Sequence, residues 1–173
     1  MTALPRLLIL IVLASALAAC VSAPPPPPAP RDTTTPAQRL AMIEKVGGVD
    51  DTELSIQPLR DPQVEDLRET AKAKRQVGDL PAAAKALDQA LALVAGDPAV
   101  LQERAEVAVL QGDWVAAERY AKQAVDLGSR TGPLCRRHWA TIEQARIARG
   151  ELENAASAKA QIASCTVPGI KRF

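Results

Sequence analysis

The sequence has few of the residues that most often build catalytic sites. Aromatic residues make up 2% of the 173 residues, and His138 is the single histidine. Catalysis needs reactive groups placed together, yet the sequence has no glycine-rich phosphate loop, no metal-spaced cluster of Cys and His, and no nucleophile motif. We expect His138, near the start of a predicted helix, to be an exposed or partly packed residue. We therefore expect no enzyme activity, no metal site and no cofactor.

The sequence also lacks an excess of charge of either sign. Arg6 is the only charged residue among the first 19, and removing it from the 21 basic residues leaves 20, equal to the 20 acidic residues. Nucleic-acid binding depends on clustered Lys and Arg that neutralise phosphates. We therefore expect no nucleic-acid partner. The length and the 14 prolines predict one modest domain with tails.

Residues 1–19 have the pattern of a secretory signal peptide. Arg6 is followed by an apolar run over residues 7–17 and by two small residues before Cys20. The apolar run has about half of the roughly 20 residues that a spanning helix needs, so a permanent transmembrane segment is the weaker interpretation. The peptide would be removed from the mature protein.

The four residues 17–20, LAAC, resemble the bacterial lipobox. This resemblance implies that the thiol of Cys20 receives a lipid whose acyl chains, palmitate among them, anchor the mature protein in a membrane. An ordinary cleavage site that has a cysteine beside it is the alternative. By resemblance to lipoprotein sorting, Val21 in place of Asp implies the periplasmic face of the outer membrane. We therefore expect an envelope lipoprotein that is tethered and does not span the membrane.

Residues 20–36 predict a lipidated N-terminus and a disordered, proline-rich stalk. The run PPPPPAP at 24–30 favours polyproline II and a spacer of roughly 20 Å, with a docking motif as the alternative. Residues 37–61 follow as a short helix and a loop. The helix is expected to be capped by Thr35, to begin at Pro36 and to run through Val46. For residues 49–59 a brief extended segment and a loop both remain open.

A repeat is the most informative feature of the rest of the sequence. The pairs Gly78-Asp79, Gly112-Asp113 and Gly150-Glu151 recur at separations of 34 and 38 residues. Prolines precede each of these turns at the predicted start of a helix, and Asp61 and Asp97 stand ready as N-caps. The pattern predicts six helices, over residues 62–77, 80–94, 98–111, 114–127, 133–149 and 152–164.

Residues 62–165 resemble the tetratricopeptide family in this period and in the small residues at close helix crossings. The resemblance implies an all-α fold, a right-handed solenoid of about three helical hairpins over residues 62–167, followed by a tail at 168–173. An antiparallel bundle is the alternative. Glu143 and Arg146 stand at positions where the family packs apolar residues, so the third repeat has an uncertain register and could be a capping hairpin. The aromatic residues Trp114, Tyr120 and Trp139 are expected in the core.

Two cysteines remain once Cys20 is assigned to the lipid. Cys135 lies near the start of the fifth predicted helix and Cys165 just past the end of the sixth, and an antiparallel hairpin brings these ends together. In an oxidising compartment such a pair favours a disulfide. We predict a structural bond between Cys135 and Cys165.

Tetratricopeptide proteins typically bind a peptide or a helix on the concave surface that the first helix of each repeat lines, and this resemblance implies a partner groove here. We predict that the protein is an adaptor or assembly factor that binds other envelope proteins. A structural tether to peptidoglycan or to a transport complex, with self-association through the repeats, is the alternative. The basic residues on the first helix would pair with an acidic partner segment. The predicted groove residues are Arg68, Lys72, Arg75, Gln102, Glu106, Val109, Arg137 and Gln144.

Overall fold

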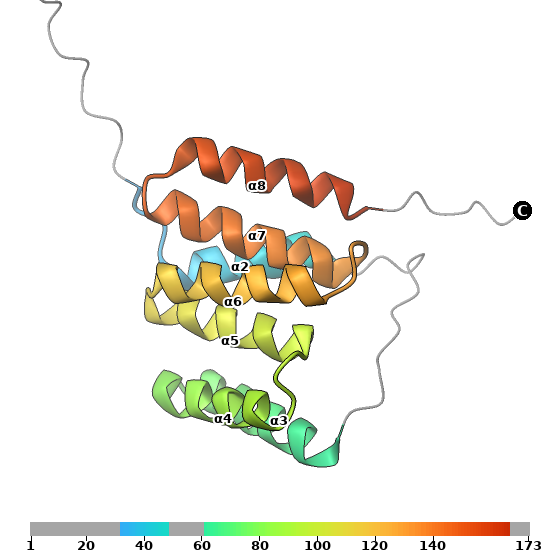
Figure 1. Cartoon of the computed structure of the whole chain (residues 1–173). Coiled ribbons are helices and arrows are strands. Elements are labelled where there is room, and N and C mark those ends of the chain that lie inside the picture. The colour runs from blue at the N-terminus through green and yellow to red at the C-terminus, as the bar shows by residue number, and fades with distance from the viewer. Residues whose placement is uncertain (1–31, 49–60, 167–173) are drawn as a thin grey trace, which may run out of the picture. The chain divides into compact units, whose positions relative to one another are not determined.

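The computed structural model describes residues 32–48 and 61–166, and every regular element in these two ranges is an α-helix (Figure 1). The predicted helix limits are confirmed to within one residue at each end. The predicted signal peptide, Cys20, the predicted stalk, residues 49–59 and the predicted tail lie outside the described residues. No described helix is long and apolar enough to cross a membrane. The helices are α2 (Pro36–Gly47), α3 (Pro62–Gln76), α4 (Leu80–Leu93), α5 (Pro98–Gln111), α6 (Trp114–Leu127), α7 (Pro133–Ala148) and α8 (Leu152–Ser164).

Helix starts follow from local chemistry. The carboxylate of Asp61 accepts a hydrogen bond from the backbone N–H of Gln63, and Asp97 accepts from the two N–H groups of residues 99 and 100. A proline at the first helical position costs the helix no hydrogen bond, because the N–H that proline lacks would have no partner there. The predicted N-caps at Asp61 and Asp97 are therefore confirmed. Gly112 ends α5 in the left-handed region, at φ 72°, which glycine adopts without steric cost.

The helices pair into three hairpins that stack on one another. Helices α3 and α4, α5 and α6, and α7 and α8 pack within hairpins, and α4 on α5 and α6 on α7 join neighbouring hairpins. Figure 1 shows this order along the stack, from the α3–α4 hairpin to α8. The predicted all-α fold of stacked helical hairpins is confirmed. Each hairpin covers the apolar face of the next, which a single hairpin cannot do alone.

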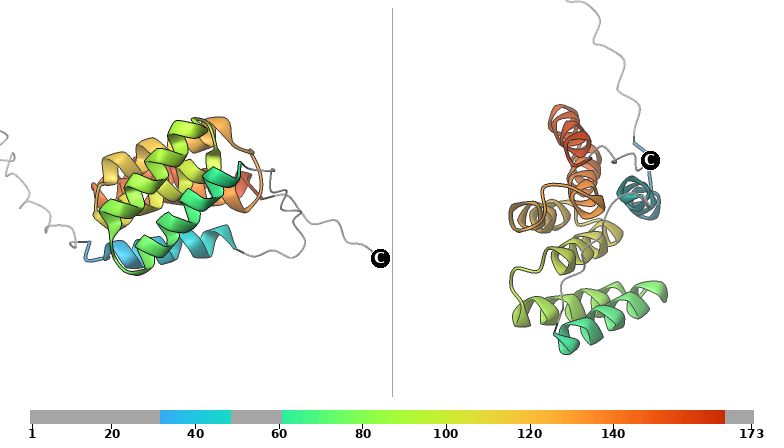
Figure 2. Two further views of the ribbon diagram at one scale, coloured as in Figure 1. Left: turned by 90° about the horizontal axis from the view of Figure 1, so that it is seen from below. Right: turned by 90° about the vertical axis from the view of Figure 1, so that its right-hand side faces the viewer.

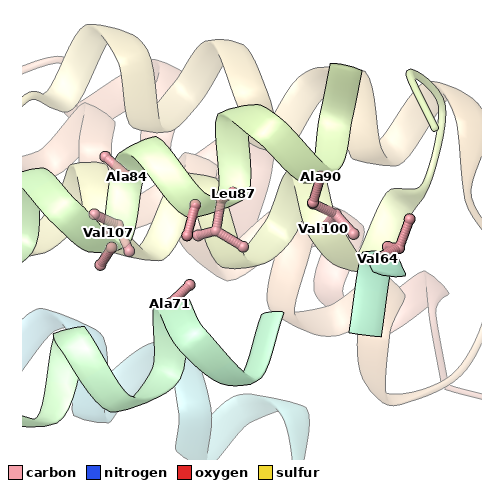
Figure 3. Packing of buried hydrophobic residues seen from close by; sticks show 9 residues of the cluster. Val64, Ala71, Ala84, Leu87, Ala90, Val100 and Val107 are labelled. Carbon is pink, nitrogen blue, oxygen red and sulfur yellow. The ribbon is translucent and has the colours of Figure 1, made fainter. Parts of the chain in front are cut away.

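Alanine lets the paired helices approach closely. In the cluster of Figure 3, Ala83 and Ala90 are fully buried, and Leu87 of α4 packs between helices α3 and α5 with Val107. Such close crossings leave room for only a few large side chains, so the packing of the core depends on each of them. Replacing a buried leucine such as Leu87 by alanine typically costs about 2–5 kcal/mol. Trp114, Tyr120 and Trp139 are half-buried and pack against the other two clusters.

An ion-pair cluster on α6 and α7 joins the third hairpin to the second. Arg146 donates from Nε to Oε1 of Glu118 at 2.9 Å, and Arg149 pairs with the other oxygen. Burial acts to raise the pKa of Glu118, but hydrogen bonds from Lys122, Arg149 and Arg146 lower it to about 2. Arg146 therefore makes an ion pair at a position where the family packs an apolar residue. Helix α8 buries only Ala155 and Ala158, as expected for a capping element.

Helix α2 lies on the stack and not in it. It precedes α3 in the chain, yet it packs against α7 and α5, and it belongs to the same compact unit as the hairpins. Leu40 and Ile43 of α2 join a core cluster that contains Ala108 and Val109 of α5. Figure 2 shows α2 on one side of the stack, beside the first helices of the hairpins. The short helix predicted as a segment before the repeat domain is thus part of that domain.

Candidate functional site

The described part of the chain has a pocket of about 260 Å³ that is lined mainly by the first helices α3, α5 and α7, with Leu87 from α4. Its floor is apolar and consists of Ala71, Leu87 and Val107. Its walls are charged and contain four basic and three acidic side chains, so the lining carries about one net positive charge. The charged residues are Arg68, Lys72, Arg75 and Arg137, with Glu69, Glu103 and Glu106.

Arg68 is held in place by two carboxylates. It donates from Nη1 to Glu65 at 2.7 Å and from Nε to Glu103 on α5 at 3.0 Å, with a second bond to Glu103. Burial acts to lower the pKa of Arg68, while hydrogen bonds and charges from Glu103 and Glu65 raise it above its usual value. Arg68 therefore joins α3 to α5 as a fixed cation.

Glu106 is a buried carboxylate that organises the opposite wall. Arg75 on α3 donates from Nη1 to Glu106 at 3.1 Å, Arg137 on α7 pairs with its other oxygen, and Gln102 donates at 3.0 Å. Two guanidinium groups thus share one carboxylate, and Arg75 also lies 3.8 Å from Glu44 on α2. Buried charges of this kind are tolerated when they are paired and hydrogen-bonded. Glu106 fixes both arginines at the edge of the pocket.

Lys72 is the most exposed cation of the pocket, and its closest ion-pair contact is longer than that of any other basic residue that lines the pocket. Its side chain is 57% exposed, and its ion pair is a 3.5 Å contact with Glu69, which is itself exposed. Such a pair contributes about 0–1 kcal/mol and is readily exchanged for another partner. Of the three basic residues predicted on α3, Lys72 is therefore the one best able to pair with a partner, because Arg68 and Arg75 are already neutralised within the protein.

The predicted groove is wrong for three of its residues. Gln102 and Val109 are fully buried, and Gln144 is 9% exposed. Leu40 and Ile43 of α2 pack in one cluster with Val109. Arg39 of α2 bonds directly to Gln144. Gln102 is turned toward α7, where it bonds to Thr141 and His138. Glu106 is also buried, but it forms a wall of the pocket. The structure therefore brings Arg68, Lys72, Arg75, Glu106 and Arg137 together and separates Gln102, Val109 and Gln144 from solvent.

The prediction of an exposed or partly packed His138 is also wrong, because the side chain is fully buried. Its Nδ1 lies 2.7 Å from Oε1 of Gln102, whose amide nitrogen donates to Glu106 and, at 2.9 Å, to Thr141. The amide oxygen must then accept, so Nδ1 of His138 carries the proton. Burial first, and the charge of Arg137 second, lower the pKa of His138 to about 4. Through Gln102, this neutral and buried histidine is connected to Glu106 in the wall of the pocket.

The two cysteines of the last hairpin are joined in the structure. Cys135 and Cys165 form a disulfide with an S–S distance of 2.01 Å, and the backbone N–H of Gly132 donates to the carbonyl of Cys165 at 2.8 Å. The bond ties the start of α7 to the end of α8. In residues 32–48 and 61–166, no group of three or more His, Cys, Asp or Glu side chains is placed to hold a metal ion.

Four solved chains match this structure, and one of them is the globular C-terminal domain of LpoP from P. aeruginosa. It has 31% sequence identity and a TM-score of 0.57, and the match covers 61% of this chain and 99% of the LpoP chain. The chain belongs to the LpoP family through this domain. No protein-family model and no curated protein matches the sequence.

Proposed function

We propose that the protein is a lipid-anchored adaptor of the bacterial envelope that binds another envelope protein in the pocket between α3, α5 and α7. The likeness to the LpoP domain fits an envelope lipoprotein that acts through protein interaction. In this proposal residues 17–20 act as a lipobox, the thiol of Cys20 carries the lipid, and Val21 favours the periplasmic face of the outer membrane. The tetratricopeptide pattern of the sequence supports the same role.

The observation that carries this proposal is the pocket itself. An apolar floor between charged walls suits a partner segment that inserts one aliphatic side chain and presents an acidic one. The walls are preorganised, because Arg68 and Glu106 are fixed by ion pairs before a partner arrives. Lys72 then supplies the exposed charge that meets the partner. Complementary charge gives the contact its specificity more than its strength.

Site-specific crosslinking in living cells tests this role. A photo-reactive residue in place of Lys72 in the pocket should capture a distinct envelope protein. Lys85 on α4 is the matched control, because it is exposed on a second helix of a hairpin and outside the pocket. Capture at both positions, or at neither, would contradict the pocket as the binding site.

The structural tether is the second candidate function. It would bind peptidoglycan or a transport complex, with self-association through the repeats. Capture of only a second copy of the chain or of cell-wall fragments at position 72 would favour the tether over the adaptor.

A further inference from the structure

Helix α2 lies across α5 and α7 as a bound helix would. Ile43 is fully buried and Leu40 is 8% exposed, and with Val46 they form one apolar stripe that packs on α5 and α7. Met42, on the other side of α2, is 46% exposed. This is the geometry in which an amphipathic helix lies in a groove, here with anchors at intervals of three residues.

The groove also recognises the C-terminal end of this helix. Arg136 on α7 donates to the carbonyl of Val46 at 3.3 Å and to that of Gly47 at 2.9 Å. Carbonyls in the last turn of a helix have no partner within the helix, so Arg136 acts as a cap supplied by the groove. A Cβ atom on Gly47 would lie 2.6 Å from Cγ of Arg137. The groove therefore selects a helix with a very small residue near its end.

Three observations indicate that α2 can leave the groove. The contact rests on few aliphatic side chains, and it buries Arg39, which bonds to Gln144 through Nη1 but whose Nε has no hydrogen-bond partner in the described part of the chain. Solvation of that group is regained when α2 undocks. The other two core clusters contain no residue of α2, so the stack keeps most of its own packing. The 12 residues 49–60 between α2 and α3 could span roughly 40 Å when extended, so connectivity does not hold α2 in place.

We propose that the surface of α5 and α7 under α2 is a binding groove for one amphipathic helix of a partner protein, and that α2 is the built-in occupant which that helix displaces. The partner helix would carry the pattern of α2: a basic residue, aliphatic residues one, four and seven positions later, and glycine at position eight. The identity of the partner rests on the proposed adaptor function, but the occupancy of the groove does not.

A labelled peptide of residues 33–48 tests the groove without any knowledge of the partner. Its binding to the mature chain is measured by fluorescence anisotropy in the parent, in Ile43→Asp, which weakens the internal α2, and in Met42→Asp, which changes an exposed residue of the same helix. The peptide should bind the Ile43→Asp chain at least tenfold more tightly than the parent, and Met42→Asp should match the parent. Equal affinity for parent and a folded Ile43→Asp chain would overturn the proposal.

Hydrogen exchange on the unmodified chain gives a second test that needs no variant to fold. The amides of α2 should exchange through a local opening at least tenfold more often than the buried amides of α5 and α7. Exchange of all three helices in one concerted step would show that α2 is a permanent part of the core and would overturn the proposal. Exchange of α2 between copies, seen as a dimer in size-exclusion chromatography, would also contradict a partner helix as the occupant. None of these readouts depends on capture at Lys72.

Discussion

Arg39 on α2 donates two hydrogen bonds to Gln144 on α7, one to the side-chain oxygen at 2.9 Å and one to the backbone oxygen at 3.3 Å. The side-chain bond involves a charged donor, and such bonds contribute about 1.5 kcal/mol or more. A double-mutant cycle of Arg39→Ala and Gln144→Ala should therefore show a coupling of about 1–2 kcal/mol in urea unfolding. The exposed Met42→Ala should show no coupling to Gln144→Ala. Additivity of both pairs would mean that α2 does not dock as described.

The disulfide between Cys135 and Cys165 closes a loop of 30 residues. In the chain-entropy model, a crosslink of this size stabilises the folded state by about 3–4 kcal/mol. Non-reducing peptide mapping of protein purified from the envelope should recover the two cysteines in one linked peptide. A reductant should lower the melting temperature of the parent. The melting temperature of a variant with alanine at both positions should not change when the reductant is added. Free thiols at both positions in the native protein would contradict the bond.

His138 should make the domain less stable in mild acid. Its pKa is lowered from 6.5 to about 4, so between these values the unfolded chain binds a proton that the folded chain does not. The free energy of unfolding is fully retained above pH 6.5 and is lost as the pH falls toward 4. The full loss is about 3 kcal/mol, since one pKa unit corresponds to about 1.4 kcal/mol.

Urea unfolding at pH 7.5 and at pH 4.5 measures this loss, with His138→Gln as the test variant. The variant should show a much smaller difference between the two pH values than the parent. Glu118→Gln is the control, because the pKa of Glu118 is lowered from 4.5 to about 2 and its contribution to stability is lost only below about pH 4.5. A parent with no slope between pH 6.5 and 4.5 would rule out a buried neutral histidine.

Cys20 is predicted to carry the membrane anchor. Replacing Cys20 by serine should leave an unacylated protein that fractionates away from membranes, because several buried acyl chains at about 0.8 kcal/mol per methylene are what holds it there. Mass spectrometry of the native protein should show the added lipid on the mature N-terminus. A Cys20→Ser protein that stays tightly bound to membranes, together with a native protein without lipid mass, would disprove the anchor.

Helix limits were predictable because they depend on neighbours in the sequence. Asp61 and Asp97 cap the helices that the prolines after them begin, and the recurrence of Gly-Asp turns predicts the stacked hairpins. The place of α2 was not predictable in this way. Leu40 and Ile43 indicate an apolar face, but nothing in the local pattern says that this face packs on helices some 60 to 100 residues further along the chain.

The pocket was predictable only in part, for the same reason. A family resemblance points to the first helices, and Arg68, Lys72, Arg75 and Arg137 do line the pocket. It does not reveal that Arg68 is neutralised by Glu103, or that Gln102 is turned inward to His138. The spacing of Gln102 and Glu106, four residues apart on one helix, was the available signal for that network. The basic surface expected on α3 is therefore reduced to Lys72.

The central claim is that a partner binds in the pocket. Because Lys72 is the basic residue of α3 best able to pair with a partner, Lys72 is the residue to change in a test of this claim. Reversing the charge of Arg68 or Arg75 would place a carboxylate beside Glu103 or Glu106 and would damage the fold. Lys72→Glu avoids this problem, because Lys72 is 57% exposed and pairs only weakly. Lys85→Glu makes the same charge change outside the pocket. Circular dichroism must show both variants as helical and as thermally stable as the parent.

The decisive measurement is a pull-down, without crosslinking, at low and at physiological salt. It compares how much of the partner identified by crosslinking is recovered by the parent and by these two folded variants. If the partner binds in the pocket, Lys72→Glu lowers the amount of recovered partner severalfold, because an attractive charge contact becomes a repulsive one. The effect should be larger at low salt. Lys85→Glu should recover as much partner as the parent. Unchanged recovery by Lys72→Glu, or an equal loss in both variants, would contradict binding at the pocket between α3, α5 and α7.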